Sequence, residues 1–156
     1  MTATRTAYEG LQDRIADMGA MLALAGAQDT DDLTAVQAER LNGLGLSDYT
    51  DTGLSDVAYS LADSYCYGAH TLYERDNDED RYIVARVELL LAGGGPTHVL
   101  TWDARGQGWS DYFDSWAQPK QPENYTGDPT RVQLSEDEWE TVRDFLAAFI
   151  VGDELA

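Results

Sequence analysis

Residues 72–116 carry the clearest strand pattern of the chain and read LYERDNDEDRYIVARVELLLAGGGPTHVLTWDARGQGWSDYFDSW. Between Tyr82 and Leu91, apolar side chains recur at every second position, which is the period of a strand with one buried face. Residues 93–96 interrupt this pattern, and β-branched and aromatic residues resume it at 98–102 and 109–116. An antiparallel meander is therefore predicted. The buried face of its longest strand is expected to carry Ile83, Ala85, Val87, Leu89 and Leu91.

Segments with apolar residues at helical spacing lie before and after the predicted sheet in the sequence. This spacing favours a first helix within residues 1–27, a second that begins at 30–33, and a third over Leu54–Tyr65. The first helix is expected to begin with a capping box at 6–9, and the last helix with one at 135–138.

These patterns predict one α+β domain over residues 1–156. We expect a helical N-terminal half, an antiparallel meander of three to five strands, and a C-terminal helix packed on the sheet. The expected parts are a helical segment over about 5–66, a sheet over about 69–134 and a last helix over about 135–151.

Negative charge is the outlying property of the composition. The chain has 29 acidic and 10 basic residues, a formal net charge of −19, yet 43% of it is hydrophobic. That hydrophobic content is sufficient for a packed core, so the chain is not a disordered acidic tail. The single cysteine, Cys66, fits the reducing cytoplasm, and no apolar run approaches the roughly 20 residues of a membrane helix. We therefore expect a cytoplasmic protein without a membrane segment.

Three explanations of this charge stay open. The acids hold water on a salt-adapted surface, or they dock on a basic partner, or they imitate the backbone of a nucleic acid. Duplex DNA carries one charge per roughly 1.7 Å of axis, so 19 charges match about 32 Å of duplex. A compact chain of this length has a radius of gyration of about 15 Å and covers a comparable length of DNA. Mimicry is therefore possible if much of the charge lies on one side.

Three groups of carboxylates are the candidate partner-binding residues. The first lies at a predicted hairpin tip, the second among aromatic residues at 109–116, and the third at every fourth position of the last helix. A solvated surface is the alternative for each group. The groups are Asp76, Asp78, Glu79 and Asp80; Asp111 and Asp114; and Glu136, Glu140 and Asp144.

No metal site, cofactor site or catalytic site is predicted. Asp76, Asp78 and Asp80 alternate as in half of an EF-hand loop, but Arg81 stands where that loop needs glycine. His70 and His98, expected in neighbouring strands, could hold a metal ion with Asp103, or act with Cys66 in a small enzyme, but no surrounding motif supports either hypothesis. The net charge should also repel nucleic acid, so direct nucleic-acid binding is not expected.

Two resemblances bear on function. The pattern LLLAGGGP, the turn at 103–106, the run at 112–116 and the acidic capped helix resemble small acidic accessory proteins of conjugative elements and phages, over residues 82–152. In size and charge, the whole chain is similar to antirestriction and anti-CRISPR proteins that act as DNA mimics. That resemblance implies a stoichiometric inhibitor, without cofactor or turnover, that fills the basic DNA channel of a CRISPR-Cas or restriction complex. The alternative is a salt-adapted accessory protein of a mobile element without mimicry.

Overall fold

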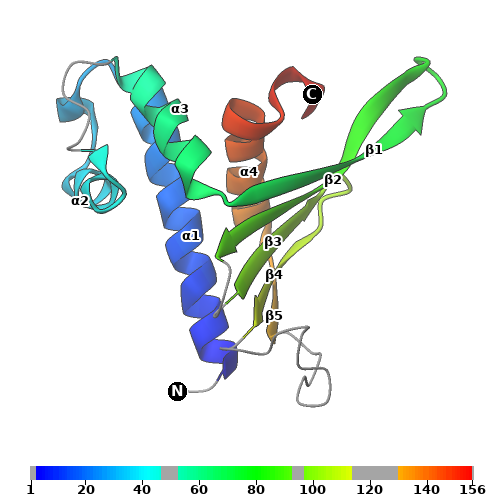
Figure 1. The fold of residues 1–156 in the computed structure, drawn as a ribbon, viewed down its shortest axis with the longest axis horizontal. Coiled ribbons are helices and arrows are strands. Elements are labelled where there is room, and N and C mark those ends of the chain that lie inside the picture. The colour runs from blue at the N-terminus through cyan, green and yellow to red at the C-terminus, as the bar shows by residue number, and fades with distance from the viewer. Residues whose placement is uncertain (1–2, 47–52, 93–96, 114–129, 156) are drawn as a thin grey trace. The chain divides into compact units, whose positions relative to one another are not determined.

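The computed structural model describes residues 3–46, 53–92, 97–113 and 130–155 (Figure 1). The chain divides into two compact units; two of the boundaries fall within its first and last helices, and the third falls between Tyr65 and Cys66. The sheet unit is Met1–Gln12 with Cys66–Trp139, and the helical unit is Asp13–Tyr65 with Glu140–Ala156. The elements are α1 (Ala3–Gly26), η1 (Thr30–Asp32), α2 (Ala35–Gly43), α3 (Leu54–Tyr65), β1 (Gly68–Asp76), β2 (Arg81–Ala92), β3 (Thr97–Asp103), β4 (Gly108–Phe113), β5 (Thr130–Gln133), α4 (Glu136–Phe145), η3 (Leu146–Ile150) and η4 (Gly152–Leu155).

The sheet unit contains a five-stranded antiparallel meander in the order β1-β2-β3-β4-β5. β3 ends at Asp103, which pairs with Arg86, so β1 and β2 run past β3 as a two-stranded ribbon (Figure 1). The ribbon closes at residues 77–80, where Asp80 has a left-handed backbone with φ of 49°. The predicted α+β class and antiparallel meander are confirmed.

Along β2, the alternation of buried and exposed side chains shifts by one residue at Ala85. In the register with β1, Ala85 is an extra residue without a partner, which is a β-bulge. Because a bulge reverses the face of the residues beyond it, Val84 is buried together with Val87, whereas Ile83 is partly exposed. The predicted buried face of this strand is therefore wrong in its first two members, Ile83 and Ala85.

Two helix ends test the predicted capping boxes. α1 begins at Ala3, so Thr6 lies inside the helix and the capping box predicted at 6–9 is wrong. The box at the last helix is confirmed: the Glu138 amide donates to Ser135 Oγ at 3.2 Å, and the Ser135 amide donates to Glu138 Oε1 at 2.8 Å. Helical backbone continues beyond α4 as the π-helix η3, close to the predicted end near residue 151.

The second helix begins later than the predicted start at 30–33. Asp29 caps a separate short turn, η1, by accepting a hydrogen bond from the Asp31 amide. Thr34 then caps α2: its hydroxyl accepts from the Gln37 amide at 3.1 Å, and its own amide donates to Gln37 Oε1 at 2.9 Å. The single helix predicted to start at 30–33 is therefore a short turn followed by a separate helix, each with its own cap. The third helix has the predicted bounds.

Trp139 attaches the first turn of α4 to the sheet. Its ring stacks on Trp102 of β3, with centroids 5.2 Å apart, and its Nε1 donates to the Asp103 carbonyl oxygen at 2.9 Å. Gln12 of α1 donates to Glu138 Oε2 at 2.6 Å on the same turn. The start of the last helix thus packs on the sheet, as predicted. The buried apolar residues of the sheet itself include Val84, Val87, Leu89, Leu91, Leu100 and Trp102.

The helical unit has its own core. Edge-to-face ring contacts join Tyr59 to Phe149, with centroids 5.2 Å apart, and Tyr65 to Phe145, with centroids 6.5 Å apart. None of the described helices is both long enough and apolar enough to cross a membrane. The buried apolar residues of this unit include Met18, Met21, Leu24, Leu41, Val57, Leu61, Val142, Phe145 and Leu146.

Candidate functional site

The carboxylates at the ribbon tip are partly neutralised by their neighbours. Arg75 pairs with Asp80, and Arg81 Nε lies 2.7 Å from Glu79 Oε2. Exposed pairs of this kind add little to stability, but they reduce the charge presented to a partner. With two arginines among its four acids, the segment 75–81 has a formal net charge of only −2.

Asp76 and Asp78 have a local role in closing the tip. The Asp78 amide donates to Asp76 Oδ1 at 3.1 Å, which is an Asx-type turn. Among the described residues, no group of three or more His, Cys, Asp or Glu side chains is placed to hold a metal ion. The Asp76 carboxylate thus stabilises the hairpin turn, and the Asp80 carboxylate pairs with Arg75 across it.

Asp111 is not a surface carboxylate, contrary to the prediction that it contacts a partner. It is only 8% exposed, and Arg131 of β5 donates two hydrogen bonds to it, at 2.7 and 2.9 Å. The hydrogen bond to Asp111 raises the pKa of Arg131 above its ordinary value. Asp114, predicted to act with Asp111, lies outside the described residues.

The other arginines of the sheet unit are also engaged within the chain. Arg86 and Arg131 both lie over the Trp109 ring, 5.2 and 4.7 Å from its centroid. Each arginine of the five strands and their described turns has a carboxylate within reach. The pairs are Arg75–Asp80, Arg81–Glu79, Arg86–Asp103, Arg105–Glu74 and Arg131–Asp111.

The helical unit has far fewer cations for its acids. Its sequence contains 14 acidic residues against 3 arginines, a net charge of −11, whereas the sheet unit contains 15 acidic against 7 basic residues. Arg143 lies 3.4 Å from its neighbour Asp144, and Arg14 lies over the Tyr65 ring at 5.2 Å. The third arginine, Arg40, is bound to Asp17. The helical unit therefore carries the larger share of the excess charge, −11 against −8 for the sheet unit.

Five exposed carboxylates of the helical unit have neither an ion-pair partner nor a hydrogen-bond partner within the described ranges. Sequence reasoning singled out only one of them, Glu140. The signal for the others is the scarcity of arginine between residues 13 and 65, where only Arg14 and Arg40 occur. The five are Asp31, Glu39, Asp56, Asp63 and Glu140.

One face of α3 concentrates two of these carboxylates. Asp56 and Asp63 are separated by two helical turns, and Tyr59 and Ser60 lie between them at the spacing of one helix face. All four side chains are exposed, and Tyr59 is 52% exposed. The predicted row Glu136, Glu140 and Asp144 on α4 is likewise exposed. The helices thus present acids at regular intervals.

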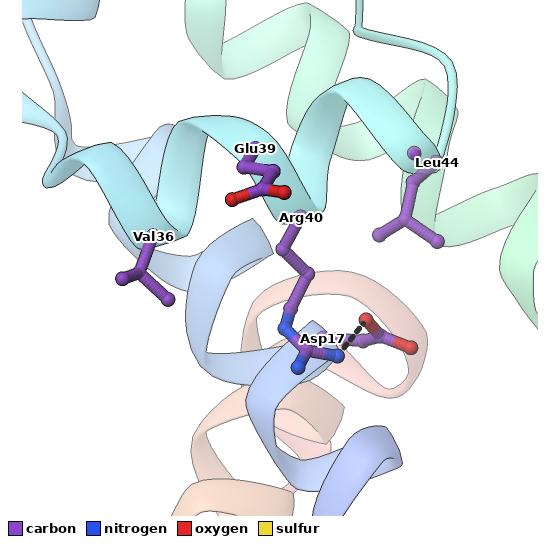
Figure 2. A pocket seen from close by; sticks show the side chains of 6 residues that line it. Asp17, Val36, Glu39, Arg40 and Leu44 are labelled. Carbon is purple, nitrogen blue, oxygen red and sulfur yellow. Dashed lines mark hydrogen bonds and ion pairs between the residues drawn. The ribbon is translucent and has the colours of Figure 1, made fainter.

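A hydrogen-bonded network joins the three helices of the helical unit. Figure 2 shows Arg40 of α2 reaching to Asp17 of α1, with Nη1 2.9 Å from Oδ1. The Tyr65 hydroxyl of α3 donates to the other oxygen, Oδ2, at 2.6 Å. Burial, together with this hydrogen bond, raises the pKa of Tyr65, and the hydrogen bond to Asp17 raises the pKa of Arg40. This network fixes α2 and α3 against α1.

A hollow of about 460 Å³ lies beside this network (Figure 2). Asp17 lines this hollow, and both of its carboxylate oxygens already accept hydrogen bonds, one from Arg40 and one from Tyr65. The Asp17 carboxylate therefore has no free oxygen for a ligand in this hollow. Its lining residues are Asp17, Val36, Glu39, Arg40, Gly43 and Leu44.

The histidines do not come together. His70 lies on β1 and His98 on β3, with β2 between them, so the prediction of neighbouring strands is wrong. His70 is exposed, with Nδ1 4.0 Å from Glu88. His98 is 3% exposed and shares a hydrogen bond with Ser110, which is fully buried. This pair joins β3 to β4 in the interior, where a substrate has no access.

The two units thus differ in how their carboxylates are used. In the sheet unit five carboxylates meet arginines, whereas the exposed acids Asp78 and Glu136 do not; in the helical unit the five acids named above have no cation within the described ranges. Comparison of the chain with protein-family models, with curated proteins and with solved structures finds no match.

Proposed function

We propose that the protein is a stoichiometric acidic inhibitor. It binds a basic nucleic-acid-binding complex of a host defence system, of the CRISPR-Cas or restriction kind, and occupies the surface that nucleic acid would take. It needs no cofactor and has no turnover. The observation that carries this proposal is the set of uncompensated carboxylates on the helical unit, which we name the helical acids: Asp31, Glu39, Asp56, Asp63 and Glu140.

The spacing of these acids supports imitation of a phosphate backbone. Asp56 and Asp63 are seven residues apart on α3, which is about 10.5 Å along the helix axis. Three steps along one DNA strand cover about 10 Å. Glu136, Glu140 and Asp144 span a comparable length, about 12 Å, on α4. Arginines that grip successive phosphates therefore meet carboxylates at a similar interval.

The electrostatics support fast, salt-sensitive association. Clustered charge of one sign steers an oppositely charged partner and raises the association rate. Because the helical acids have no cation of their own among the described residues, a partner's arginine need not displace an existing ion pair. At the ribbon tip, by contrast, binding would first have to separate Asp80 from Arg75 and Glu79 from Arg81. The helical unit is therefore the better docking surface.

The Asp17 network supports preorganisation of this surface. α2 carries Glu39 and α3 carries Asp56 and Asp63, and both helices are tied to α1 through Arg40 and Tyr65. Carboxylates on rigid helices lose little conformational entropy when they bind. The network thus serves binding by holding the acids at a fixed spacing.

A displacement assay tests the proposal. A fluorescently labelled 20-base-pair duplex is bound to purified restriction and CRISPR-Cas effector complexes, and this protein is added at increasing concentration. We expect it to displace the duplex from at least one complex at about 50 mM NaCl, and we expect direct binding of the labelled protein to that complex to weaken when NaCl rises to about 500 mM. Duplex retained by every complex at low salt would contradict the proposal. A directly measured affinity that is indifferent to salt would contradict charge mimicry.

A further inference from the structure

The outermost strand of the sheet is open to solvent. Within the described residues, β1 has one neighbour, β2, and its second edge is unpaired (Figure 1). Of its nine residues, only Thr71 and Asp76 are even partly covered. An edge strand with free amide and carbonyl groups is a template for pairing with another strand.

Over Gly68–Tyr73, β1 lacks the usual protection of an edge strand, because its charged residues Glu74, Arg75 and Asp76 are confined to one end. It contains no proline and no lysine, and the bulge of the β1–β2 pair lies on β2, at Ala85. Leu72 and Tyr73, at its centre, are 40% and 51% exposed. Tyr67, next to β1, and Tyr82, on β2, are more than 70% exposed. Most of the exposed large apolar side chains of the described chain thus gather around this edge.

The sequence of β1 is complementary to itself. Two copies of β1 that pair antiparallel are related by a two-fold axis between them. Residues that face each other across such a pair point to the same side of the sheet, so the axis lies beside a residue that faces its own copy. An axis at Leu72, the midpoint of Gly68–Asp76, pairs all nine residues. Leu72 then faces Leu72, Thr71 faces Tyr73, and His70 faces Glu74. These are an apolar pair, an aromatic pair with a β-branched residue, and a pair of an imidazole donor with a carboxylate acceptor.

Other registers are poorer. An axis at Tyr73 places Leu72 opposite Glu74, and an axis at Glu74 or at Arg75 places like charges directly opposite each other. An axis at Thr71 leaves Arg75 and Asp76 unpaired. The longest overlap and the best match of facing side chains therefore coincide at Leu72.

We propose that a second copy of this chain pairs with β1 in this register, which joins two five-stranded sheets into one continuous ten-stranded sheet. Each copy carries a formal charge of −19, so repulsion opposes the dimer and added salt relieves it. Self-association therefore strengthens with salt, whereas binding to a basic partner weakens. The opposite salt dependence keeps the two proposals experimentally separate.

Sedimentation equilibrium tests the dimer. The full chain is examined between about 1 and about 100 µM at about 0.1 and about 0.5 M NaCl. We expect a monomer–dimer equilibrium whose Kd falls at the higher salt. Leu72→Asp removes an apolar pair and places two carboxylates face to face, so it should raise the Kd about tenfold or more. Val36→Asp makes a similar change at an exposed site of α2 and should leave the Kd unchanged. A monomer at all concentrations, or equal effects of the two variants, would overturn the proposal.

Cysteine cross-linking tests the register in a Cys66→Ser background. Leu72→Cys should form a disulfide with its own copy, because facing Cα atoms lie about 4.5–5.5 Å apart. Glu74→Cys should not, because its copies lie about 14 Å apart along the strands. A mixture of the Glu74→Cys and His70→Cys chains should cross-link. Self-cross-linking of Glu74→Cys without that of Leu72→Cys would exclude the register.

Discussion

Asp111 on β4 and Arg131 on β5 lie opposite each other in the sheet, and the guanidinium donates to both carboxylate oxygens, at 2.7 and 2.9 Å. The carboxylate is buried, whereas the Arg131 side chain is about half exposed. The pair fastens the short edge strand β5 to the sheet. Asp111 therefore contributes to the fold and is not available to a partner.

Replacing Arg131 should destabilise the fold. Arg131→Met leaves the Asp111 carboxylate buried without its donor, which should lower the free energy of unfolding by about 1–3 kcal/mol. Urea denaturation measures the change. Arg105→Met is the matched control, because Arg105 and Glu74 are both well exposed, and its effect should stay within about 0.5 kcal/mol. Equal effects of the two variants would show that the buried pair has no special role.

Tyr65→Phe should loosen the helical unit. The variant removes the hydroxyl that donates to Asp17, while the ring contact with Phe145 can remain. Loss of a hydrogen bond to a charged group should cost about 1.5–3 kcal/mol in urea denaturation. Tyr82→Phe, at a site 71% exposed, is the control and should cost almost nothing. A wild-type free energy of unfolding in Tyr65→Phe would refute the role of the network.

The raised pKa of Tyr65 predicts a loss of stability at alkaline pH. Burial is its main cause, so the folded state keeps the phenolic proton above pH 10, whereas the unfolded state releases it near its ordinary pKa of about 10. The stabilisation is complete below about pH 10 and is lost as pH rises above that value. The free energy of unfolding should fall more steeply with pH in the wild type than in Tyr65→Phe. Parallel pH profiles of the two proteins would contradict this assignment.

Folding in dilute buffer separates mimicry from salt adaptation. An inhibitor that binds through its acids must be folded at low salt, whereas a salt-adapted protein needs molar salt to screen its surface. We expect circular dichroism to show folded protein in about 10 mM buffer, with a cooperative thermal transition. A transition that appears only in molar salt would favour the salt-adapted alternative.

Much of the fold follows from local patterns in the sequence. Period-two runs predicted the strands, and Ser135 with Glu138 predicted the start of α4. The phase change at Ala85 was not predictable, because a bulge depends on how β1 and β2 are paired and not on composition. The caps at Asp29 and Thr34 were visible in the sequence, but the acids at 30–33 suggested an earlier helix start.

The candidate site was less predictable. The charge excess is evident from composition, but its location depends on which carboxylates find an arginine. Asp111 and Arg131 are 20 positions apart, and only the β4–β5 register brings them together. The pairs at the tip were more accessible to reasoning, because Arg75 and Arg81 flank the acids directly. Because the arginines of the strands pair with acids at the tip and within the sheet, the candidate binding surface lies on the helices and not at the tip.

The most direct test compares two variants that each lose four charges, in the duplex displacement assay at about 50 mM NaCl. The helical variant combines Glu39→Gln, Asp56→Asn, Asp63→Asn and Glu140→Gln. The tip variant combines Asp76→Asn, Asp78→Asn, Glu79→Gln and Asp80→Asn.

The helical variant should need at least about tenfold more protein to displace the duplex, since it loses several partner contacts of about 1 kcal/mol each. The tip variant should stay within about threefold of the wild type, because two of its four acids are already paired. Equal losses in the two variants would mean that net charge alone matters, and a larger loss in the tip variant would contradict the assignment of binding to the helical acids.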